Sequence, residues 1–172
     1  MVSISAAAEY DIPWILEIER EAISPPWTHG TLLGEMYSVD SFFAVAHETP
    51  GCGGDRVQLD DGRRHEGLGF VILRRIGDNG ELLQIAVDKA VRRHGVADKL
   101  MCAALEFAGK SSLRSVFLEV RKSNESAFAL YIKHGFVTVH QRAGYYSEPI
   151  EDAIVMVCYE NRHQSLPHFP TF

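Results

Sequence analysis

The chain has 172 residues and a formal net charge of −6, and 46% of its residues are hydrophobic. This length suits one domain with its own core, and the acidic balance argues against direct binding of nucleic acid, which needs basic side chains to hold phosphates. No apolar run approaches the roughly 18 residues of a membrane span, and the first residues lack the basic and apolar segments of a signal peptide. We therefore expect a cytoplasmic protein without membrane contacts.

The N-terminal quarter predicts four elements in the order strand, helix, helix, strand, over residues 2–5, 12–23, 28–37 and 41–47. Asp11 and Thr28 are candidate caps for the two helices. Residues 48–66 are rich in glycine and charged side chains and exceed the usual length of a strand connection. We interpret them as a long surface loop.

The remaining chain predicts two strands, a helix, a strand, a helix and two strands, over 67–75, 81–88, 95–108, 114–120, 124–133, 136–142 and 152–159. The first two strands form an antiparallel hairpin, Asn124 caps the second helix, and residues 143–151 form a loop. The unit from Leu82 to Val120 is a parallel crossover. This order predicts a single α/β domain over 1–159, followed by an irregular tail over 160–172.

Cysteine and histidine spacing argues against disulfides and metal sites. Cys52, Cys102 and Cys158 are odd in number and far apart, which is typical of free thiols in a reducing compartment. The eight histidines show no spacing typical of a zinc site. The sequence therefore predicts no metal.

A basic turn, Arg92-Arg93-His94-Gly95-Val96-Ala97, joins a predicted strand to a predicted helix. The first amides of a helix lack partners and attract anions, and Gly95 allows a ligand to approach the backbone closely. The turn lacks the GK[ST] of a P-loop and the GxGxxG of a dinucleotide fold. By its local chemistry it either holds a phosphate or only begins a helix with surface charges.

The segment "LLQIAVDKAVRRHGVADKLM" resembles the acetyl-CoA-binding motif of the GCN5-related N-acetyltransferases (GNAT). In that family Arg/Gln-x-x-Gly-x-Gly/Ala follows a bulged strand, and Arg92, Gly95 and Ala97 match it. The segments "PPW", "FLEVRKSNESAFALYIKHGF" and "AGYYSEPIEDAIVMV" extend the resemblance over nearly the whole chain and are similar to the bacterial ribosomal-protein-alanine N-acetyltransferase (RimI-type) subgroup. The long 48–66 loop and the aromatic tail depart from that subgroup, and both bear on the substrate entrance.

The resemblance implies a GNAT fold, with a mixed, mostly antiparallel sheet of about seven strands, a splayed parallel pair and about four flanking helices. It implies acetyl-CoA as the acetyl donor, with the turn amides on the coenzyme pyrophosphate and the preceding strand beside the pantetheine arm. Asn124 caps its helix and is ranked second as a coenzyme contact. The implied coenzyme-binding residues are Ile85, Ala86, Val87, Arg92, Arg93, His94, Gly95, Val96, Ala97 and Asn124.

The resemblance also assigns catalytic roles. Glu119 corresponds to a general base, and Tyr131 to the general acid that protonates the leaving thiolate. Strand alternation puts Phe117, Glu119 and Arg121 on one face of their strand. The alternatives are a structural salt bridge of Glu119 with Arg121, and a tyrosine that only packs its helix. The backbone N–H of Val87 is the expected donor to the acetyl carbonyl oxygen.

Aromatic and acidic residues are candidates for the substrate walls. Tyr145, Tyr146 and Glu151 suit a cationic peptide N-terminus, although such residues are common in loops. Trp27 either lines the opposite wall or fills the core. The implied substrate is a protein N-terminus, above all the N-terminal alanine of the eighteenth small-subunit ribosomal protein. The alternatives are an acetyltransferase for lysine or a small amine, and a non-catalytic acyl-CoA-binding module.

Overall fold

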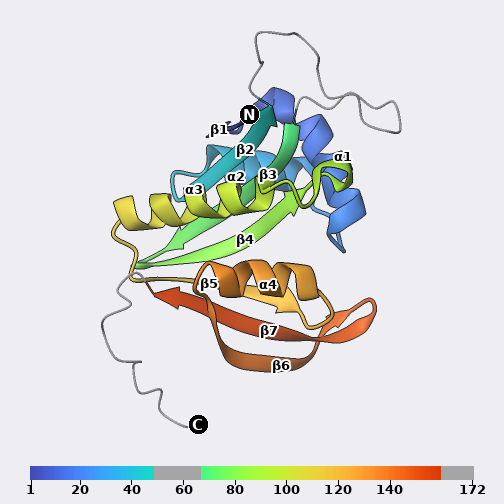
Figure 1. Cartoon of the computed structure of the whole chain (residues 1–172), viewed down its shortest axis with the longest axis vertical. Helices are drawn as coiled ribbons and strands as arrows, with labels where there is room; N and C mark the ends of the chain where they lie inside the picture. The colour runs from blue at the N-terminus through green and yellow to red at the C-terminus, as the bar shows by residue number, and fades with distance from the viewer. Residues whose placement is uncertain (49–66, 160–172) are drawn as a thin grey trace.

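A seven-stranded sheet in the order β1-β2-β3-β4-β5-β7-β6 organises the protein. In the computed structural model, residues 1–48 and 67–159 are described. Helices α3 and α4 lie over one face of the sheet, and α1 and α2 lie over the other face (Figure 1). The predictions of a 48–66 loop and an irregular 160–172 tail fall almost entirely outside the described residues, and the domain bounds stay a prediction.

The observed element order matches the predicted order. The strands are β1 (Val2–Ala6), β2 (Ser41–Glu48), β3 (Gly67–Ile76), β4 (Asn79–Val87), β5 (Ser115–Arg121), β6 (Val137–Ser147) and β7 (Ile150–Tyr159). The helices are α1 (Ile12–Ala22), α2 (His29–Tyr37), α3 (Val96–Lys110) and α4 (Glu125–Lys133), with short 3-10 turns η1 (Glu9–Asp11) and η2 (Lys89–Val91).

Two of the three predicted helix caps are confirmed. The Thr28 hydroxyl accepts a hydrogen bond from the Thr31 amide at 3.1 Å, and the Asn124 side chain accepts one from the Ala127 amide at 3.2 Å. The prediction for Asp11 is wrong. Its buried carboxylate accepts from the Ala8 amide and the Trp14 indole, because η1 runs directly into α1 and turns this side chain toward the core.

The prediction of a loop over 143–151 is also wrong. β6 continues to Ser147 and β7 begins at Ile150, so that Tyr145 and Tyr146 lie on a strand. The hairpin extends past the predicted end because Asp152 accepts hydrogen bonds from the Gly144 amide at 2.9 Å and from the Gln141 side chain at 2.6 Å. A register shift between Arg142 and Tyr146 absorbs the irregular sequence.

The parallel pair β4–β5 is present and splayed. It contains the residue pairs Asn79↔Ser115, Gly80↔Val116 and Glu81↔Phe117, and beyond them the two strands diverge toward their carboxyl ends (Figure 1). β4 also has the expected bulge, because its register with β3 shifts at Leu83, between the pairs of Leu82 and Gln84. The sheet therefore opens beside the bulged strand, as the predicted fold requires.

Candidate active site

The basic turn lies at the end of β4 and leads into α3. Arg93 and Gly95 adopt positive φ angles of 67° and 78°, and a Cβ on Gly95 would meet nothing within 4 Å. The requirement for glycine is therefore conformational. The Arg92 Nε donates to the Val87 carbonyl at 3.2 Å and ties the turn to the strand, while the side chains of Arg93 and His94 are exposed.

The first turn of α3 carries one acid, Asp98, whose charge is already compensated. Its Oδ1 lies 2.6 Å from the Lys133 Nζ and 3.0 Å from the His134 Nε2. The hydrogen bond from Lys133 holds the pKa of Asp98 below its ordinary value. The start of α3, with its buried Val96 and half-buried Ala97, can thus receive an anion without facing an unpaired carboxylate.

The last residues of β4 border the splay. Parallel pairing ends at Glu81, so that Ile85, Ala86 and Val87 lie past the last residue pair with β5. Ala86 and Val87 are buried and Ile85 is half-buried. Their backbone is thus positioned to pair with an extended ligand, the role predicted for the pantetheine arm.

Glu119 projects from β5 with two partners from β6. Its Oε1 lies 2.5 Å from the Arg142 Nη1, and a hydrogen bond to Glu119 is the main cause that raises the pKa of Tyr145. The alternative salt bridge with Arg121 does not form, since Arg121 pairs with Glu151 at 3.3 Å. The Glu119 side chain remains about a fifth exposed despite these partners.

Tyr131 approaches from the opposite face of the sheet. It is 7% exposed and belongs to the core under α3 and α4. Burial raises the pKa of Tyr131, and nearby Tyr146 adds to the rise. The phenol therefore stays protonated at physiological pH and is available as a proton donor.

Tyr146 links these groups. Its ring lies 5.2 Å from that of Tyr145, and the Arg121 guanidinium lies 4.1 Å from the Tyr146 ring centre. Burial raises the pKa of Tyr146, and the charge of Glu119 raises it further. The structure thus brings Glu119, Tyr131, Tyr145 and Tyr146 together where β4 and β5 separate.

The remaining predicted residues have structural partners. Hydrogen bonds from the Ser123 side chain and the Ser123 amide lower the pKa of Glu151, which also pairs with Arg121. Trp27 is half-buried and packs against the core under α1 and α2. The Asn124 side chain caps α4 and accepts from the Ser126 hydroxyl at 3.1 Å.

Arg121 joins two segments that flank the site. Its guanidinium donates to the Glu148 carbonyl at 3.0 Å in the β6–β7 turn and to the Ser24 carbonyl at 3.4 Å in the α1–α2 connection. The connection that carries Trp27 and the hairpin that carries Tyr146 therefore meet at one side chain. Sequence reasoning considered Arg121 only as a partner of Glu119.

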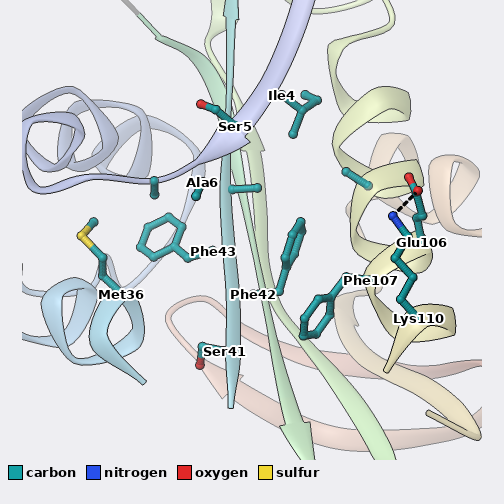
Figure 2. Close-up of a pocket in the computed structure, with 13 residues that line it drawn as sticks. Ile4, Ser5, Ala6, Met36, Ser41, Phe42, Phe43, Glu106, Phe107 and Lys110 are labelled. Atoms are coloured by element: carbon teal, nitrogen blue, oxygen red, sulfur yellow. Dashed lines mark ion pairs between the residues drawn. The ribbon is translucent and has the colours of Figure 1, made fainter. Parts of the chain in front are cut away.

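A separate pocket of about 560 Å³ lies beside β1 and β2, where the short strand β1 leaves part of β2 uncovered. Figure 2 shows Phe42 stacked on Phe107 and the Glu106–Lys110 ion pair at its wall. No predicted site residue lines this pocket.

Within residues 1–48 and 67–159, no group of three metal-ligating side chains is found. The same residues contain no helix long and apolar enough to cross a membrane.

Comparisons with known proteins agree with this geometry. The [Ribosomal protein bS18]-alanine N-acetyltransferase of Haemophilus ducreyi is 30% identical over 159 residues, covering 91% of this chain and 99% of the relative. That of Haemophilus influenzae is 32% identical over 166 residues, covering 92% and 99%. The crystal structure of the Escherichia coli ribosomal-protein-S18-alanine N-acetyltransferase superposes with a TM-score of 0.77 at 26% identity, over 98% of this chain and all of the other. Residues 20–136 match the Acetyltransferase (GNAT) family, and the chain therefore belongs to this family of acetyl-CoA-dependent N-acetyltransferases.

Proposed function

We propose that the protein transfers the acetyl group of acetyl-CoA to a protein N-terminal amine in the cytoplasm, above all the N-terminal alanine of ribosomal protein bS18. The observation that carries this proposal is the similarity to bS18-alanine N-acetyltransferases over nearly the full length of both chains. The partly exposed Glu119 and the buried Tyr131 support a direct transfer.

The coenzyme is held by the turn and the bulged strand. The amides from Arg92 to Ala97 bind the pyrophosphate, and Arg93 adds positive charge. The backbone of Ile85, Ala86 and Val87 pairs with the pantetheine arm, and the Val87 N–H donates to the thioester carbonyl oxygen, where negative charge develops. The open space over Gly95 and the end of β4, which no longer pairs with β5, fit such a ligand.

Transfer requires two proton movements. The neutral amine attacks the thioester carbonyl carbon, the new C–N bond forms and the C–S bond breaks. Glu119 takes the proton that the nitrogen loses, and Tyr131 gives a proton to the departing thiolate sulfur. An α-amine with a pKa of about 7.7–8 is partly neutral at physiological pH, whereas lysine at about 10.4 is not, so a modest base suits an N-terminal substrate.

Mass spectrometry tests the substrate class. The protein is incubated with acetyl-CoA and two peptides that begin Ala-Arg, one with a free N-terminus and no lysine, and one with a blocked N-terminus and an internal lysine. We expect acetylation of the first peptide. Modification of the lysine peptide alone contradicts the proposal, and tight coenzyme binding without transfer to any amine indicates a binding module.

A further inference from the structure

An acid lies where a core residue is expected on α1. Glu19 follows Ile12 and Ile15 on the buried stripe of the helix, and its exposed fraction is 0%. Neither carboxylate oxygen has a partner at full hydrogen-bonding distance and angle among the described residues, and the polar groups that approach Glu19 are the Gln84 side chain and the Trp27 backbone. A second buried acid, Glu35 on α2, is instead paired with Arg74 and Ser41. Unpartnered buried acceptors are uncommon in native proteins and call for a physical reason.

Gln84 on β4 faces Glu19. It is 7% exposed, and its side-chain oxygen also lacks a partner among the described residues. The bulge explains its direction. Leu82 and Ile85 pack in the core under α3, whereas Leu83 packs in the core under α1, and Gln84 contacts Glu19 on that same side. Two consecutive residues of the bulge therefore point toward α1.

This pair lies across the splay from the proposed general base. Glu81 is the last residue of β4 that pairs with β5, opposite Phe117. If the bulged residues Leu83 and Gln84 are counted as one position, Gln84 lies at the same height along β4 as Glu119 along β5. Val116, Leu118 and Val120 pack in the core under α3, so that Glu119 points to the other face, which is the face of Gln84.

We propose that Gln84 binds the acceptor amine through its side-chain oxygen, and that Glu19 is the positioning residue that orients the Gln84 amide. This inference rests on the proposed function in taking a primary amine as the acceptor. A carboxylate attracts the NH2 end of a neighbouring amide, which directs the amide oxygen away from Glu19. The amine then donates one N–H to Gln84 and gives the other proton to Glu119, and its lone pair is left for the thioester carbon.

Replacement of Gln84 by leucine tests the contact. Two peptides are compared, one beginning with alanine and one with N-methylalanine, which has one N–H fewer. We expect Gln84→Leu to lower kcat/KM for the alanine peptide about tenfold or more, as for a lost buried hydrogen bond, while the KM for acetyl-CoA stays unchanged. The penalty for N-methylation should be smaller in the variant than in the native enzyme. Equal penalties in the two enzymes overturn the inference.

Two further variants separate function from folding. Gln84→Met repeats the test with an unbranched side chain of similar length that carries no amide oxygen. Glu19→Gln should lower kcat/KM for the peptide without lowering the melting temperature. The matched control is Glu35→Gln, which breaks a buried ion pair away from the splay. This control should lower the melting temperature and leave the peptide kcat/KM unchanged. If Glu19→Gln behaves like Glu35→Gln, Glu19 has only a structural role.

The outcome is distinguishable from failure of the proposed function. If the native enzyme acetylates only lysine side chains, the N-terminal proposal fails. The same Gln84→Leu comparison, made with lysine and N-methyllysine peptides, still decides whether Gln84 binds the amine.

Discussion

The guanidinium of Arg142 lies 2.5 Å from the carboxylate of Glu119, although β7 separates their two strands in the sheet. The proposed base is therefore held by the strand that also carries Tyr145 and Tyr146. A displacement of the β6–β7 hairpin would move the partner of the proposed base and the proposed substrate wall together.

Glu119→Gln should abolish proton abstraction with little change in shape. We expect kcat/KM for the N-terminal peptide to fall by about 10²–10⁴-fold, with an unchanged dissociation constant for coenzyme A. Steady-state kinetics and calorimetry measure these quantities. Full activity of the variant would leave the base role without support.

Arg142→Ala tests whether the ion pair positions Glu119. We expect a smaller loss of kcat/KM than in Glu119→Gln, because the base remains but its partner is gone. In the double variant the two losses should not add, since both act on one group. Additive losses would mean that Arg142 acts independently, for example on the peptide.

Tyr131→Phe removes the proposed acid and keeps the buried ring. We expect kcat to fall while the KM values for both substrates and the melting temperature change little. Because burial raises the pKa of Tyr131, its ionisation should cause no loss of native activity below about pH 10. A pH–rate profile of both proteins checks this point.

Gly95→Ala tests the conformation of the turn. The added Cβ meets no atom within 4 Å, but φ is 78°, so we expect a backbone cost of about 1–2 kcal/mol and weaker coenzyme binding. The control is Gly34→Ala in α2, also without a neighbour within 4 Å, which should raise stability by about 0.5–1 kcal/mol without affecting coenzyme binding.

Glu19→Gln should change the pH dependence of stability. Burial raises the pKa of Glu19 above its ordinary value of 4.5, so the folded state binds more protons than the unfolded state just above that pH. The free energy of unfolding of the native protein should therefore fall relative to the variant as the pH rises above about 4.5. Urea unfolding at a series of pH values measures the difference, and a constant difference would contradict a buried, titrating Glu19.

The order of elements was predictable because it depends on local hydrophobic periodicity and on the glycine, proline and capping residues between the elements. The splayed pair and the bulge came from the family resemblance. What the sequence could not show depends on which partner a side chain finds. Asp11 accepts from the nearby Trp14 indole instead of capping α1, Asp152 accepts from the Gly144 amide and extends the hairpin, and Arg142 pairs with Glu119 across β7. Glu19 was overlooked, although an acid on the apolar stripe of Ile12 and Ile15 was a readable signal.

Only the residues from Asn79 to Glu81 pair β4 with β5, whereas long antiparallel ladders run through β1–β4 and through β5–β7. The sheet thus consists of two antiparallel halves that are joined only by this short parallel pairing. A ligand between the diverging strand ends contacts both halves of the sheet. It stabilises their joined arrangement by a free energy that depends on the ligand concentration and its Kd. Saturating coenzyme should therefore slow amide exchange most in β4 and β5, where the two halves of the sheet meet.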